Sequence, residues 1–225
     1  MPARGMTERV RIEERISRLV PTRHPPIQAF EDVATPEDLD AVMALEGWTN
    51  DRLVVQRLRR LPSERRVFGR ANASVIMAAF LHASPHGARF SGPDLGAWYC
   101  SLRTTTAIAE VAHHLRREAK NVGWREMRGQ YRCYGAGLAG SYVDIRGQQN
   151  RLPEIYDPTS WAASQAYGER LRAADEDGIV YDSLRHEGGV NVVAYDPRQV
   201  LDVQIGPSFD LIVPVEGRIV ARQLA

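Results

Sequence analysis

Four polar side chains of this sequence could act on a small anionic ligand. Arg89 lies in the glycine-containing segment GARFSGPDLG (87–96), where glycine lets the backbone approach a ligand and a guanidinium can bind phosphate through two parallel hydrogen bonds. Tyr99 follows Trp98, and on a strand these two rings point to opposite faces, so one enters the core while the other can line a cleft and stack on a flat heterocycle. Glu110 could stabilise positive charge that develops on a sugar ring. Ser183 could donate a hydrogen bond to the ligand.

Each of these residues also has an ordinary structural interpretation. On spacing alone, Arg89 reads as a surface arginine, and Tyr99 as a core or edge aromatic. Glu110 could pair with His114, four residues later, on the solvated face of a helix. Ser183 lies between two expected strands, where serine usually forms a turn, and no GxSxG motif surrounds it. Helix periodicity leaves the direction of the Glu110 side chain open.

Metal-binding and dinucleotide-binding motifs are missing from the sequence. His82 and His86 are separated by a proline, and His113 and His114 are adjacent, so neither pair has the spacing of metal ligands on one helical face. There is no HExxH, no CxxC, no Walker A motif and no GxGxxG fingerprint, and the two cysteines do not form a ligand pattern. We therefore expect no metal site and no Rossmann-type binding.

The elements that position these residues are a mixture of helices and strands. AWYCSL (97–102) predicts a strand, and Thr104 to Thr106 predict the cap of a helix that runs to about Lys120, with an apolar stripe at Ile108, Val111, Ala112 and Leu115. Residues 178–195 predict a strand, a loop and a second strand, and residues 200–205 and 209–215 predict edge strands. Without a strict alternation of strand and helix, the class is α+β.

Other segments give weaker signals. The apolar run SVIMAAFLH (74–82) predicts a buried strand. Arg103 and the stretch GQYRCYGAGLAG (129–140) could each lie at a cleft edge, and for the stretch we favour a flexible loop. Thr35-Pro36-Glu37-Asp38 predicts the start of a helix. We expect residues 1–17 to be a flexible or helical arm and residues 18–225 to be one catalytic domain.

Composition limits the classes of partner. No apolar run is long enough to span a bilayer and the first residues contain no apolar core of a secretory signal, so we expect a cytoplasmic protein. All but one of the 29 basic residues are arginine, which we attribute to a bias of the coding sequence. The net charge is only +1, because 28 acidic residues are interleaved with the basic ones, and we expect no membrane partner and no directly bound nucleic acid.

Three segments, in order, resemble the RES family, which is named for its arginine, glutamate and serine. The segment 18–53 is similar to the N-terminal extension of one subgroup. GARFSGPDLGAWYCSLRTTTAIAEVAHH (87–114) resembles the family's central motif, and DGIVYDSLRHEGGVNVVAYDP (177–197) resembles its "GI-x-Y-x-S-x-R … GG-x-N" segment. The resemblance covers about residues 18–200. It places the family's invariant positions at Arg89, Tyr99, Glu110 and Ser183, and a frequent asparagine at Asn191.

The resemblance implies a compact body like that of ADP-ribosyltransferase toxins, with NAD as substrate in a cleft between two small mixed sheets. It implies a toxin of a toxin–antitoxin pair, whose antitoxin covers the NAD cleft, and cleavage of the nicotinamide–ribose bond without a metal. Glu110 would then stabilise the cationic ribose, Arg89 would hold the diphosphate, and Tyr99 would stack on nicotinamide or ribose. Ser183 would hydrogen-bond the ribose or amide.

The resemblance assigns two further residues to the site, less directly than the four invariant positions. Asn191 and His82 would contribute to binding NAD. His82 would take the place of an upstream arginine that many members have and for which this sequence shows no clear counterpart.

The acceptor of ADP-ribose stays open among a protein side chain, phosphate and water, and we favour a cellular protein. A phosphorylase or glycohydrolase that depletes NAD is the alternative within the same chemistry. From other classes, a ribonuclease would need a His/Lys or paired-His site with a basic groove, and a non-catalytic binding module would not require Arg89, Tyr99 and Glu110 to meet in one cleft.

Overall fold

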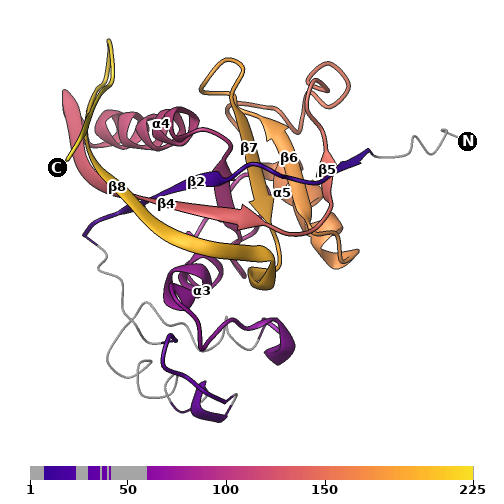
Figure 1. Cartoon of the computed structure of the whole chain (residues 1–225). Helices are drawn as coiled ribbons and strands as arrows, with labels where there is room; N and C mark the ends of the chain where they lie inside the picture. The colour runs from indigo at the N-terminus through magenta and orange to yellow at the C-terminus, as the bar shows by residue number, and fades with distance from the viewer. Residues whose placement is uncertain (1–7, 24–29, 36, 40, 42–59, 225) are drawn as a thin grey trace, which may run out of the picture.

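The computed structural model describes residues 8–23, 30–35, 37–39, 41 and 60–224. Within them, nine strands form one hydrogen-bonded sheet in the order β1-β5-β6-β7-β3-β2-β4-β8-β9 (Figure 1). All neighbouring pairs are antiparallel except β5 and β6. The strands are β1 Arg9–Val10, β2 Ile16–Pro21, β3 Trp98–Ser101, β4 Glu126–Leu138, β5 Tyr142–Asp144, β6 Gly178–Asp182, β7 Val190–Ala194, β8 Val200–Pro214 and β9 Val220–Gln223.

The sheet consists of two halves that meet at a narrow junction. β2 and β3 share a single Cα pair, Ser17 with Ser101, whereas β2 and β4 share six. Nη1 of Arg18 donates to the carbonyl oxygen of Tyr99 at 2.8 Å and adds a second link across the junction. The expected α+β class is confirmed, but the two small sheets that we expected are two halves of one continuous sheet.

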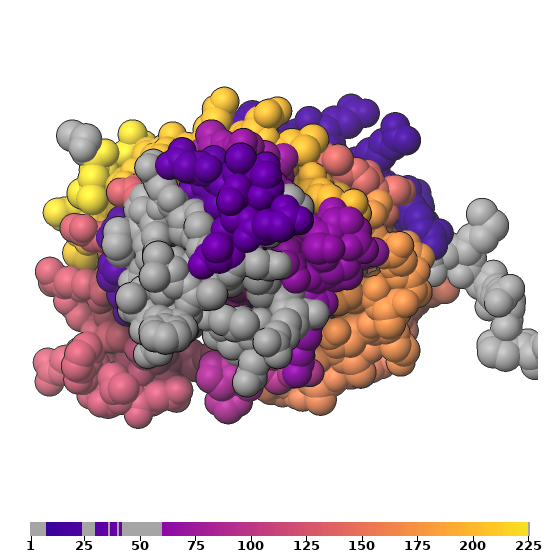
Figure 2. Space-filling model, turned by 90° about the horizontal axis from the view of Figure 1, so that it is seen from below, coloured from indigo at the N-terminus to yellow at the C-terminus, as the bar shows by residue number. Residues whose placement is uncertain are grey.

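Three helices pack against these halves. α3 (Ala73–Leu81) lies at one side of the molecule, α4 (Thr104–Val122) lies across β2, β4 and β8, and α5 (Ala162–Ala173) lies against β6 (Figure 1). Two short 3-10 helices, η1 (Ser63–Arg65) and η2 (Pro197–Gln199), also lie in the described part of the chain. In the view from below, purple atoms of the N-terminal third occupy the middle of the face, beside orange atoms of the C-terminal third (Figure 2). No helix of the described residues is both long and apolar enough to cross a membrane.

The apolar stripe of α4 forms one of the core clusters. Ala112 and Leu115 are buried against Leu211 and Val213 of β8, and Ile108 packs beside them, which confirms the predicted stripe. The larger core clusters lie on α3 and the centre of the sheet and, separately, beneath α5. Trp98 is fully buried in the first of these, so this ring takes the core side of β3.

Several expected elements have a different form. The run 74–82 is helix α3 rather than a strand, and seven of its nine residues are buried. A short segment that is apolar on all sides has no periodicity that separates a buried helix from a buried strand. The expected edge strands 200–205 and 209–215 are one strand, β8, and the edge position belongs to β9. The threonines at 104–106 lie inside α4, whose N-cap is Arg103.

The prediction of a flexible loop at 129–140 is also wrong, because most of this segment belongs to strand β4. Gly135 and Gly137 border a register shift in the pairing of β4 with β8, so the glycines mark a bulge within a strand. Of the expected N-terminal arm, residues 9–10 and 16–17 are strand residues, not helix. The cap at Thr35 is confirmed, because its hydroxyl accepts the amide of Asp38 at 3.1 Å.

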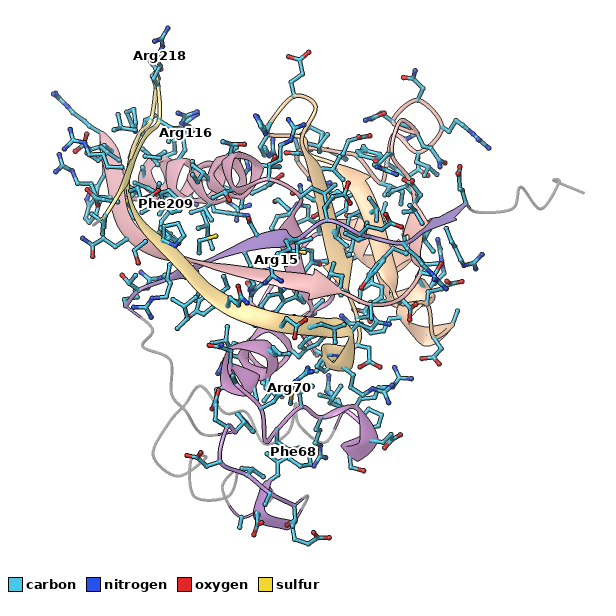
Figure 3. All side chains as sticks on the ribbon, in the orientation of Figure 1. Arg15, Phe68, Arg70, Arg116, Phe209 and Arg218 are labelled. Carbon is cyan, nitrogen blue, oxygen red and sulfur yellow. The ribbon has the colours of Figure 1, made fainter. Side chains whose placement is uncertain are left out.

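Arginines hold β8 in place through its carbonyl groups. Three side chains from different elements each donate to a carbonyl oxygen of this long strand at 2.9–3.0 Å (Figure 3). The pairs are Arg15 with Asp202, Arg70 with Val200, and Arg116 with Pro214. Whatever the origin of the arginine bias, these side chains serve as multiple hydrogen-bond donors in the fold.

Gly168 provides a test of how closely α5 packs. A Cβ at this position would lie 2.1 Å from the carbonyl oxygen of Phe90 and 2.7 Å from the hydroxyl of Tyr195. We expect Gly168→Ala to lower the free energy of unfolding by about 1–3 kcal/mol, as overpacking does, measured by urea denaturation. Without this close approach the same change would stabilise the helix by up to about 1 kcal/mol, because alanine is the better helix former. A stabilised variant would therefore contradict the packing.

Candidate active site

A cleft of about 950 Å³ lies at the junction of the two half-sheets. Its lining includes Ser17 and Arg18 of β2, Tyr99 of β3, and Glu110 of α4. The loop before β3, the segment 158–162 and the loop between β6 and β7 supply further lining residues. The cleft therefore forms where the two halves share least hydrogen bonding, and residues from distant parts of the chain meet in it.

Glu110 points into this cleft and is held by two neutral donors. Its Oε1 accepts hydrogen bonds from the hydroxyl of Ser183 and from Nδ2 of Asn191, both at 2.7 Å. Asn191 is itself buried and accepts the hydroxyl of Ser101 at 2.6 Å. These contacts connect α4 with β3, β6 and β7, and they fix the carboxylate without neutralising it.

Ser183 has its hydroxyl oriented by the loop that carries it. Its oxygen accepts the backbone amides of Arg185 and His186 at 3.1 and 3.0 Å, and its hydrogen is directed to Glu110. The residue is both the turn former that its position suggested and a hydrogen-bond donor in the cleft. Its proton is committed to Glu110.

Arg89 stands at the tip of a tight loop that is anchored on both sides. The backbones of Ala88 and Ser91 exchange hydrogen bonds, and Nη1 of Arg89 donates to the carbonyl oxygens of Ile155 and Asp157 at 3.2 and 3.1 Å. One guanidinium nitrogen therefore ties the loop to the segment before α5. Arg89 also lines the cleft, and its guanidinium has further N–H donors besides those of Nη1.

Tyr99 lines the cleft on the face of β3 opposite to Trp98, as the alternation predicted. Its hydroxyl oxygen accepts the amide of Phe90 at 2.9 Å and lies 3.0 Å from the hydroxyl of Ser91. Burial raises the pKa of Tyr99 to about 12, so the phenol stays protonated at neutral pH. Tyr99 thus supports the loop of Arg89.

Arg18 is a site residue that the sequence reasoning missed. It lines the cleft from β2, and its guanidinium carbon lies 4.9 Å from the centre of the Trp98 ring. Burial lowers its pKa to about 10, which leaves it charged at neutral pH. Its Nε is buried and has no hydrogen-bond partner in the described part of the chain. The available signal was an arginine flanked by the apolar residues of a strand, ISRLVP.

The described lining of the cleft is strongly cationic. Glu110 is its one carboxylate, and it stands against four arginines. They are Arg18, Arg89, Arg117 and Arg185. The protein as a whole has a net charge of only +1, so the positive charge is concentrated where a ligand would bind.

Three histidines, one of them His86 of the loop before β3, and a tryptophan lie in the same cleft. His113 and His114 belong to α4, and Trp161 immediately precedes α5. The ring of Trp161 contacts that of His114 edge-on, with centroids 6.2 Å apart, and the guanidinium of Arg117 lies 5.4 Å from the indole centre. Sequence analysis did not assign Trp161 or Arg117 to the site.

His82 does not lie among the residues of the cleft. It is an exposed residue that ends α3, so the structure does not bring it to Glu110. Among the described residues, no three His, Cys, Asp or Glu side chains are grouped so as to hold a metal ion.

The cationic surroundings of His113 predict a pH dependence of stability. Burial, with the neighbouring charge of Arg185, lowers the pKa of His113 to about 4 from 6.5. Between these values the unfolded chain binds a proton that the folded chain does not, so the free energy of unfolding falls as pH is lowered from 6.5 towards 4. We expect His113→Gln to show a smaller fall in urea denaturation at pH 7, 5.5 and 4.5. Equal slopes for both proteins would refute this assignment.

Comparison with known proteins identifies the family to which this protein belongs. The RES domain model matches residues 63–214, and no curated protein matches the sequence. One similar solved structure is described as "Crystal structure of the M.tuberculosis MbcT-MbcA toxin-antitoxin complex"; it is 19% identical, covers 56% of this chain and 73% of its own, and has a TM-score of 0.44, a likeness too small to carry an argument. Because the family model covers more than half of the chain and includes Arg89, Tyr99, Glu110 and Ser183, the protein belongs to the RES domain family.

Proposed function

We propose that this protein is an enzyme that breaks the nicotinamide–ribose bond of NAD and transfers the ADP-ribose to an acceptor. The observation that carries the proposal is Glu110, a carboxylate held by two neutral donors in a cleft whose lining also includes four arginines. NAD combines an anionic diphosphate with a ribose that becomes cationic when nicotinamide leaves. One cleft with separate positive and negative groups suits both parts of that substrate.

The arginines would bind the diphosphate. Arg185 lines the cleft together with Arg89 and Arg117, and all three share the lining with Glu110. The mutual repulsion of these guanidinium groups is relieved when a dianionic group binds among them. Arg18, whose buried Nε has no partner in the described structure, would supply a further donor next to Tyr99.

In the reaction, the bond between the ribose C1′ and the nicotinamide nitrogen breaks. Its electron pair leaves with nicotinamide, which becomes neutral, and the positive charge passes to the ribose as an oxocarbenium-like state. Glu110 lies ready to stabilise that charge because Ser183 and Asn191 hold its side chain before substrate binds. A lone pair of the acceptor then forms the new bond to C1′, and the acceptor's proton passes to solvent.

These contacts change the proposed roles of the supporting residues. Ser183 and Asn191 would position Glu110 rather than bind the substrate directly, since their donor groups are already engaged with it. The ring of Tyr99 would line the part of the cleft that binds nicotinamide, and its hydroxyl would hold the loop that carries Arg89. None of these roles requires a metal.

For the acceptor, we propose a side chain of a cellular protein, with phosphate and water as the alternatives. Incubation with labelled NAD and a cell extract, with phosphate, and in plain buffer separates the three. A labelled protein band supports transfer to protein. A phosphorylated ADP-ribose or free ADP-ribose without a protein adduct would instead support the phosphorylase or glycohydrolase.

Replacement of the carboxylate tests the reaction itself. We expect Glu110→Gln to lower kcat for nicotinamide release by roughly 100- to 1,000-fold, because the amide cannot offset the developing charge. Glu118→Gln, an exposed position of the same helix, is the matched control and should keep full activity. If the wild-type protein releases no nicotinamide from NAD, in phosphate or in other buffers, the proposed activity is wrong.

By resemblance to the toxins of its family, we further propose that the protein acts in the cytoplasm as a toxin and that an antitoxin protein covers the cleft. Expression without the partner should then arrest growth, because the cell loses NAD or gains a modified protein. Glu110→Ala should restore growth at equal protein levels, checked by immunoblot. An equally toxic Glu110→Ala variant would show that the toxicity does not depend on this carboxylate.

A further inference from the structure

Trp161 lines the cleft where the segment 158–162 meets α4. Arg117 lies over its ring at 5.4 Å and His114 meets it edge-on, so two side chains of α4 hold the indole in place. The residue is partly exposed and lines the cleft. We propose that Trp161, together with Arg117, is the binding platform for the adenine of the dinucleotide; this inference rests on the proposed function.

Helix α4 sets the distance between the two ends of the site. His114 and Arg117 follow Glu110 by four and seven residues, which places them on the same side of the helix. At a rise of 1.5 Å per residue, they lie about 6 and 10 Å along the axis from Glu110. A ribose, two phosphates and a second ribose separate nicotinamide from adenine. With the nicotinamide ribose at Glu110, a dinucleotide that extends along α4 would bring its adenine to Trp161.

The cationic residues of the same cleft suit the diphosphate of this ligand. Arg89 and Arg185 line the cleft together with Arg117 and His113. The cleft thus supplies a carboxylate, cations and an aromatic ring, and NAD presents a ribose, a diphosphate and an adenine.

An indole covered by a guanidinium is suited to a heteroaromatic base. Bases stack on aromatic rings through their π-faces, and arginine adds a cation–π contribution. Removal of such a stacking side chain weakens binding by roughly 5- to 100-fold. The platform should therefore act on affinity for the adenylate half and leave the bond-breaking step unaffected.

The test compares ligands with and without the adenylate half. Trp161→Ala and Trp161→Leu should each raise the KM for NAD by roughly 5- to 100-fold with kcat within about twofold, while Trp161→Phe stays near wild type. Cleavage of nicotinamide mononucleotide, which lacks adenylate, should be equal in all variants. Trp124→Ala, an exposed tryptophan outside the cleft lining, is the control and should behave as wild type.

Calorimetric titration with AMP gives a readout that does not depend on catalysis. The wild type and Trp161→Phe should bind AMP, and both Trp161→Ala and Trp161→Leu should bind it more weakly by the same factor as for NAD. Unchanged AMP affinity in these two variants, or equal losses with NAD and nicotinamide mononucleotide, would overturn the platform. If the protein binds AMP through Trp161 but cleaves no NAD, the inference of an adenine platform stands and the proposed reaction is refuted.

Discussion

The two halves of the sheet are joined by one residue pair, Ser17 of β2 with Ser101 of β3, and the position of the cleft depends on this junction. Where two strands stop pairing, side chains from both can face a common space. Arg18 and Tyr99 border it, and the bond between the Arg18 guanidinium and the Tyr99 carbonyl oxygen keeps the halves from separating. The hydroxyls of Ser17 and Thr104, 2.8 Å apart, attach the start of α4 to the same point.

From that point, α4 carries the site along its length. Its apolar stripe packs on β8 through Leu115 and Ala112, and this packing fixes the rotation of the helix about its axis. The opposite side then turns Glu110, His114 and Arg117 towards the cleft. A hydrophobic contact far from the cleft therefore determines which polar residues reach the substrate.

The positive charges in the cleft repel one another, and this repulsion opposes folding unless other groups compensate the charges. Burial, and after it repulsion from neighbouring cations, lowers the pKa of Arg185 and of His113. Backbone carbonyl groups compensate part of this, as Ile155 and Asp157 do for Arg89. An anionic substrate would relieve the rest, so such a site should be more stable when the ligand is bound.

Local sequence determined those elements whose apolar pattern has a clear period. The strand at Trp98, the helix with Leu115 on its buried side and the pair of strands around Ser183 were all predicted, because alternation and helical spacing reflect which face is buried. The segments that form α3 and β4 were predicted wrongly, as a strand and as a loop. An apolar run and a glycine-containing strand have no such period. These segments are defined by the neighbours that cover them.

By itself, the sequence determined the residue types and their order, and through them the family and four candidate site positions. Only the tertiary structure decided that Glu110 faces a cleft and binds Ser183 and Asn191, which lie more than seventy residues away. It also brought Arg18 and Trp161 to that cleft and left His82 outside it. The physical reason is that a side chain's environment is set by contacts between distant segments, and local spacing carries no record of them.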